Sequence, residues 1–208
     1  MAITIPAAPA QSIDALRAAL PSLVNRSAVA NLAPRLGAAL TASSAVASLT
    51  PVLSYKVYTL GLSDLATAAS NGLRAAKSSL WRHTLTTDGE VVTADVSVDQ
   101  TGANHKFAAL SSNPSAAAVQ NAIHALNQDA NISKASYEFS LLQVSALGVR
   151  AVWLHDSSGK ASDILVPVAP VRSELVAGRQ YQVAEFTAAL KDAAAKILAD
   201  DDPLKGSA

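Results

Sequence analysis

The chain has 208 residues, half of them hydrophobic and only 4% aromatic, so we expect a compact core closed mainly by alanine and aliphatic side chains. Sixteen basic residues balance sixteen acidic ones, which disfavours nucleic acid as a partner because binding to phosphates requires clustered positive charge. The sequence has no cysteine, which excludes disulfides, thiolate nucleophiles and cysteine metal sites.

The beginning of the chain, MAITIPAAPA, lacks the basic and continuously apolar regions of a secretory signal. No apolar run elsewhere reaches the length of a membrane span. We therefore expect a cytoplasmic protein without a membrane partner.

Residues 1–50 are predicted to form an extended arm followed by helices. Pro6 and Pro9 prevent a helix at the start of the arm, and residues 3–5 alternate as in an edge strand. A short helix is expected from Ser12, as its N-cap, to Pro21. A second helix is expected between Pro34 and Thr50.

Residues 52–98 are predicted to hold a strand, a helix and a hairpin. The sequence VLSYKVYTL at 52–60 alternates apolar and polar side chains, as in a half-buried strand. Leucines and alanines at helical spacing over 62–76 indicate a helix. The pair Asp88-Gly89 separates two strand-like segments, 79–86 and 90–98, which is typical of a hairpin.

The rest of the chain is predicted to contain one more helix, three strands and a C-terminal helix. After a polar loop at 99–112, Asn113-Pro114 supplies an N-cap and first turn. Three further segments have strand character, and they lie at 137–144, 149–155 and 163–168. A connector at 170–182 leads to a helix whose apolar stripe runs from Val183 to Ile197.

This order predicts an α+β fold, an antiparallel sheet with helices packed on it. Between residues 52 and 144 the elements follow the order of a ferredoxin-like βαββαβ core, to which a hairpin and the C-terminal helix are added. We divide the chain into an arm with helices at 1–50, a core domain at 51–200 and a tail at 201–208.

A tandem duplication is the alternative architecture. The segments SYKVYTLGLSDL at 54–65 and SYEFSLLQVSAL at 136–147 share five identical residues in register, Ser, Tyr, Leu, Ser and Leu. Each is preceded by an alanine-rich helical segment and followed by a Trp-x-His sequence. Two αβββ units in tandem would explain this pattern.

The two Trp-x-His sequences are the candidate ligand site. Residues i and i+2 share one face of a strand, so Trp81 lies beside His83 and Trp153 beside His155. If the two strands are neighbours, the four side chains could line an aromatic pocket with two titratable bases. Polar partners in that pocket would be Arg82 and Asp156, the latter orienting His155. The competing interpretation is that the tryptophans fill the core and the histidines lie near solvent at the strand ends.

Other chemistry is not indicated. Four histidines without an HExxH pattern make a metal site improbable. A Gly-x-Ser-x-Gly elbow, a phosphate-binding loop and a dinucleotide fingerprint are all missing from the sequence. We therefore expect no cofactor.

Two functions are considered. The preferred hypothesis is a non-catalytic structural or interaction protein that self-assembles into a homo-oligomer. It is based on the 15% content of charged residues and on the strand at 149–155, which is apolar on both faces and therefore needs cover on both sides. The alternative is a small-ligand-binding protein or an enzyme that uses the Trp/His cluster.

Overall fold

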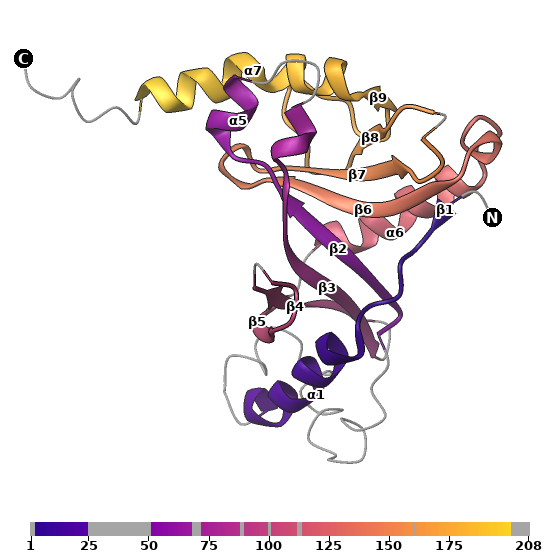
Figure 1. The fold of residues 1–208 in the computed structure, drawn as a ribbon, viewed down its shortest axis with the longest axis vertical. Coiled ribbons are helices and arrows are strands. Elements are labelled where there is room, and N and C mark those ends of the chain that lie inside the picture. The colour runs from indigo at the N-terminus through magenta and orange to yellow at the C-terminus, as the bar shows by residue number, and fades with distance from the viewer. Residues whose placement is uncertain are drawn as a thin grey trace, which may run out of the picture. The chain divides into compact units, whose positions relative to one another are not determined.

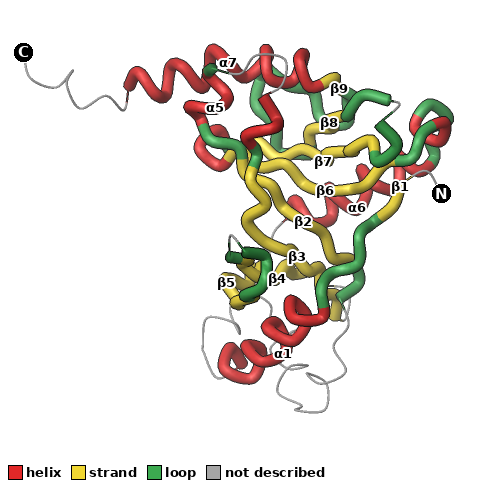
Figure 2. Tube along the Cα trace, in the orientation of Figure 1, coloured by secondary structure: helices red, strands yellow, loops and turns green. Residues whose placement is uncertain are grey.

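The computed structural model describes residues 3–24, 51–67, 72–87, 90–99, 101–111, 114–159 and 161–200. The chain is a mixed α+β protein whose strands pair mostly antiparallel, with a short parallel pair between Ile3–Thr4 and Tyr137–Glu138. It divides into two compact units (Figures 1 and 2). The first unit comprises Met1–Thr4, Tyr58–Lys77 and Asn121–Ala208, and the second comprises Ile5–Val57 and Ser78–Gln120.

The second unit is a four-stranded meander with a helix packed on it. Its strands follow in the order β5-β4-β3-β2, and they are β2 (Leu53–Thr59), β3 (Lys77–Thr87), β4 (Glu90–Val98) and β5 (His105–Ser111). Strand β2 ends in the first unit and β3 begins there. The register Thr87↔Glu90 leaves two residues for the turn, so the hairpin predicted around Asp88-Gly89 is confirmed.

Helix α1 (Ala10–Val24) covers one face of this meander. Its Leu16 and Leu20 are fully buried against alternate residues of β3 and β4, a cluster that contains Leu85, Val92, Ala94 and Val96. The period of two along the strands and the spacing of four along the helix place these side chains on facing surfaces.

The first unit is built on a second meander, β6-β7-β8-β9. Its strands are β6 (Tyr137–Val144), β7 (Val149–Asp156), β8 (Ile164–Pro167) and β9 (Tyr181–Gln182). Strand β1 (Ile3–Thr4) pairs parallel to β6, which places part of the predicted arm at a sheet edge. Short 3-10 turns, η2 (Ile132–Lys134) and η3 (Ser145–Leu147), flank β6.

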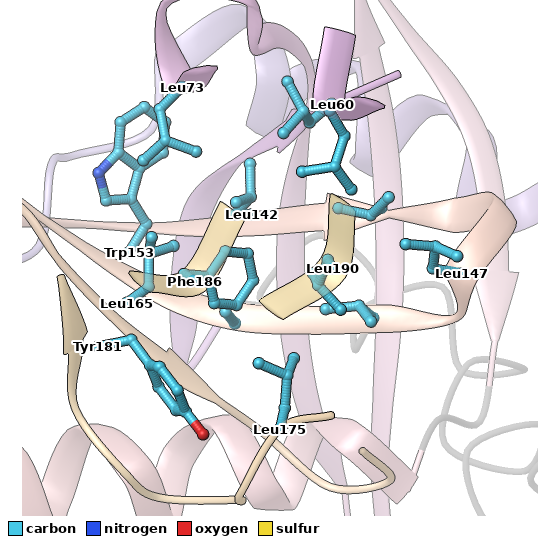
Figure 3. Close-up of a cluster of buried hydrophobic side chains, with 14 of the residues drawn as sticks. Leu60, Leu73, Leu142, Leu147, Trp153, Leu165, Leu175, Tyr181, Phe186 and Leu190 are labelled. Carbon is cyan, nitrogen blue, oxygen red and sulfur yellow. The ribbon is translucent and has the colours of Figure 1, made fainter. Parts of the chain in front are cut away.

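Three helical segments complete the first unit together with the end of α6 (Pro114–Asn127). They are α5 (Leu62–Ala66), η1 (Gly72–Ala75) and α7 (Val183–Asp200). Buried residues of α7, including Phe186 and Leu190, pack with Trp153 and Leu165 in one cluster (Figure 3).

Strand β7 is covered on both faces within the first unit. Trp153 lies in the cluster on the α7 side, while Val152 and Leu154 on the opposite face have no exposed surface. Figure 1 shows α6 on the side of β6 and β7 away from α7. Both apolar faces of this strand are therefore buried within the chain itself. Their apolar character is no longer an argument for a partner subunit.

The ferredoxin-like order is not confirmed. In that core the first strand lies between the third and fourth, whereas β2 here is a neighbour of β3, the second strand. Among the described residues of 62–76, the predicted helix is present as the five-residue α5 and the four-residue η1. The strand that follows them returns directly beside β2, so β3 takes the place that the third strand has in the ferredoxin-like order.

Two other local predictions were wrong. The segment 99–112 was predicted as a loop but contains β5, whose Phe107 and Leu110 pack against the α1 cluster. Helix α1 begins two residues before Ser12, because the Pro9 carbonyl already accepts the Ser12 N–H at 3.0 Å, and it continues through Pro21 to Val24. Ser12 is therefore no N-cap, and its hydroxyl is free to point at the sheet.

The helix expected at 34–50 lies outside the described residues. Both units contain strands in sequential order, but the tandem duplication stays a prediction, as does the division into 1–50, 51–200 and 201–208. None of the described helices combines the length and the apolar character needed to cross a membrane.

Candidate functional site

The two Trp-x-His sequences belong to different units. Trp81, Arg82 and His83 lie on β3 in the second unit, whereas Trp153, His155 and Asp156 lie on β7 in the first. Each set therefore has its own surroundings.

In the second unit, Arg82 is held by an acidic residue of the neighbouring strand. Its Nε and Nη2 donate to the two carboxylate oxygens of Asp95 at 2.7 and 2.8 Å. The two residues are direct partners in the β3–β4 register, and both side chains are largely buried. This bidentate pair satisfies the guanidinium inside the unit.

Trp81 and His83 face the α1 side of the same strand. Trp81 is buried, and the Lys56 ammonium lies 5.8 Å from the centre of its ring. His83 has no exposed surface, and its Nε2 and Nδ1 each lie 2.8 Å from a serine hydroxyl, of Ser12 and Ser54 respectively. Burial lowers the pKa of His83 to about 4, so the ring is neutral at neutral pH and bonds to one serine as donor and to the other as acceptor.

The expectation that both histidines lie near solvent is thus wrong for His83. It holds for His155, whose side chain is 58% exposed. The β3 residues Arg82 and His83 are buried and hydrogen-bonded to protein groups.

In the first unit, the Asp163 carboxylate is hydrogen-bonded to the side chains of both Trp153 and His155. The indole Nε1 of Trp153 donates to Oδ2 of Asp163 at 2.9 Å, and Nδ1 of His155 lies 3.0 Å from the same oxygen. The other oxygen of Asp163 accepts the backbone N–H of Asp156 at 3.0 Å. A proton on Nδ1 satisfies this contact and leaves Nε2 of a neutral His155 as a hydrogen-bond acceptor.

Asp163, and not Asp156, is the residue that orients His155. Adjacent strand residues point to opposite faces, so the Asp156 side chain cannot follow that of His155. Its carboxylate instead accepts hydrogen bonds from the Ser158 hydroxyl at 2.6 Å and from the Ala161 N–H at 2.6 Å, which holds the β7–β8 turn.

Asp163 was missed as a site residue, although the hairpin register contains the signal. Leu154 pairs with Ile164, so the next position toward the turn places His155 opposite Asp163. Counting outward from a two-residue turn at Ser158-Gly159 would have paired His155 with Ser162 instead, so the sequence alone misses Asp163 by one position.

The aromatic rings on this face form a row. Tyr58 and Trp153 meet edge to face with ring centres 5.0 Å apart, and Trp153 and His155 do so at 6.0 Å. Glu138 is the β6 partner of His155 in the register. The pKa of Tyr58 is raised by burial and by the nearby Glu138 carboxylate. We name this set, Tyr58, Glu138, Trp153, His155 and Asp163, the aromatic row.

An open pocket of about 530 Å³ adjoins the row at Asp163. Its polar lining comes from three segments of the first unit that meet at the start of α7, and it includes Arg74, Ser162, Asp163 and Gln182. Leu73, whose side chain lies beside the Trp153 indole in Figure 3, closes the apolar side. Residues from η1, the β7–β8 turn and the β9–α7 junction therefore converge on one cavity.

Within the described ranges, no three histidine, aspartate or glutamate side chains lie close enough together to hold a metal ion. Comparison of the chain with protein-family models, with curated proteins and with solved structures gives no match. The function must therefore be argued from the geometry of the first unit.

Proposed function

We propose that the first unit binds a small polar ligand in the pocket beside Asp163. The observation that carries this proposal is the position of the Asp163 carboxylate, which fixes both Trp153 and His155 and also lines the cavity. A ligand in the pocket would contact side chains whose orientation is already set, which lowers the entropic cost of binding.

The lining suggests the kind of ligand. Arg74, Ser162 and Gln182 offer hydrogen-bond donors, while Leu73 offers an apolar wall. A molecule of a few rings with several hydrogen-bond acceptors suits a cavity of this size and mixed character.

The test is a fragment screen on the full-length chain. The variant Trp81→Phe leaves Trp153 as the sole tryptophan, so its fluorescence reports on the row, and NMR shifts locate each bound fragment. We expect hits that shift the amides of Arg74, Ser162 and Gln182. Asp163→Asn places an amide N–H₂ group toward the donors on Trp153 and His155. It should raise the dissociation constant of such a hit at least about tenfold, because a misoriented polar contact costs about 1–3 kcal/mol.

The matched control is His124→Gln, which changes an exposed histidine on α6 that contacts Gln128. This variant should bind each hit as the unchanged chain does. A screen that gives no hit at this pocket, or hits whose affinity is indifferent to Asp163→Asn, would contradict the proposed function.

Self-association is a second proposal, and it is supported by a different observation. Among the described strands of the second unit, β5 is the last in the order and has a neighbour only on the β4 side. An edge strand offers backbone N–H and C=O groups to another chain. The low content of charged residues, 15%, also favours an interaction protein. Measuring the mass of the full chain in solution tests whether it self-associates.

A further inference from the structure

The Ser12–His83–Ser54 cluster, in which Ser12 and His83 are fully buried and Ser54 is half-buried, joins three elements of the second unit. Ser12 comes from α1, His83 from β3 and Ser54 from β2, and both contacts to the imidazole are 2.8 Å long. The Ser12–His83 contact is a polar link between α1 and the meander, next to the apolar contacts of Leu16 and Leu20.

We propose that this cluster is an acid-sensitive latch that keeps α1 docked on the meander and releases the helix when His83 takes up a proton. The two serine hydroxyls can accept hydrogen bonds from a protonated ring, so hydrogen bonding is retained. The cost comes from the charge, because a cation without solvent contact loses its hydration and finds no carboxylate in the cluster.

The charged groups around the cluster do not remove this cost. Asp95 on β4 attracts a protonated His83, but both of its oxygens already accept hydrogen bonds from Arg82. His105 on β5 has the opposite, repulsive effect. Lys56 on β2 lies on the same side as Trp81, and α1 adds the half-buried Arg17 and the exposed Asp14.

The direction of the pH response follows from the pKa of His83, which burial lowers from 6.5 to about 4. When α1 is undocked, His83 on β3 takes up its proton as the pH falls below 6.5, whereas the ring beneath the docked helix stays neutral until about pH 4. The stabilisation from the neutral ring is therefore complete above pH 6.5 and is lost as the pH falls toward 4.

The experiment is native-state hydrogen exchange on the full chain between pH 7.5 and 4.5, with rates corrected for the intrinsic pH dependence. We expect the opening constant of the α1 amides to rise by up to about tenfold per pH unit below 6.5, as uptake of one proton requires. The amides of β3 and β4, in the same unit, should keep their protection. His83→Gln keeps a donor and an acceptor but does not titrate, so its α1 amides should show no such pH dependence.

His124→Gln is the control and should retain the full response, because His124 is exposed. Should His83→Gln fail to fold, an NMR titration of the His83 ring in the unchanged chain replaces it, and α1 opening must then follow the proton uptake by that ring. The proposal is overturned if α1 protection does not change with pH, if the strands open together with α1, or if His83→Gln responds as the unchanged chain does.

Discussion

The pair Arg82 and Asp95 shows how a buried charge is tolerated in a small sheet. Both side chains lie inside the second unit, 9% and 14% exposed, and they form two parallel hydrogen bonds across neighbouring strands. Removing one partner leaves the other as an uncompensated charge. We expect Asp95→Ala to lower the free energy of unfolding by about 3 kcal/mol. The double variant Arg82→Met with Asp95→Leu leaves no unpaired charge, so its free energy of unfolding should be close to that of the unchanged chain.

Urea unfolding followed by circular dichroism measures these differences. Glu185→Ala provides the comparison, since it breaks the Arg179–Glu185 pair, whose side chains are 53% and 43% exposed. That change should cost less than about 1 kcal/mol because solvent screens an exposed pair. Equal losses for Asp95→Ala and Glu185→Ala would show that burial does not set the strength of the Arg82 pair.

The sequence predicted which single residues share a strand face, but not their partners across strands. The i, i+2 rule placed Trp153 beside His155, as the structure shows. It could not assign Asp163, because that residue is reached only through the register of β7 and β8. Nor did it indicate that His83 would be buried between serines from α1 and β2, since both contacts depend on how the elements pack.

At the scale of elements, α7 is held to the first unit by one apolar stripe. Phe186 is fully buried in the cluster with Trp153 and Leu165, whereas Leu198 near the other end of the helix is 37% exposed. Phe186→Ala should therefore lower the free energy of unfolding by about 3–5 kcal/mol. Leu198→Ala should change it by less than about 1 kcal/mol.

Chemical denaturation of both variants, monitored through Trp153 in a Trp81→Phe background, measures this contrast. The tryptophan lies in the same cluster as Phe186, so its emission reports on the unit in which the substitution is made. A loss at Leu198→Ala as large as that at Phe186→Ala would mean that the end of α7 has a role in stability that its exposure does not explain.

Elements with a clear period were predicted well, and elements without one were not. The alternating segments of β2 and β4 and the stripes of α6 and α7 match their predicted ranges closely, and so do the apolar strands β6 and β7. Strand β5 has the sequence HKFAALS, in which alternation is interrupted by the register shift opposite Asp95 and Val96. A bulge of this kind moves one residue out of the period of two, and the pattern is then easily taken for a loop.

At the scale of the whole chain, the order of elements did not determine how the strands are arranged. The ferredoxin-like order and a simple meander start from similar strings of strands and helices. They differ in where the second strand is placed in the sheet. Here β3 returns directly beside β2, which the local pattern of residues does not determine, so the second unit is a meander.

Self-association through β5 is the prediction that concerns the whole chain. Lysine on an edge strand hinders pairing with another chain, because the charged group would have to lose its hydration. Strand β5 already carries one exposed lysine, Lys106, and a second one would add to this effect. Ala108 on β5 is exposed, so we expect Ala108→Lys to shift an oligomer to the monomer in light scattering across a wide concentration range. Ala18→Lys, at an exposed position of α1, makes the same chemical change away from the edge and should leave the mass unaltered. If the chain is monomeric at every concentration, self-association is not its function. If an oligomer persists in Ala108→Lys, β5 is not the interface.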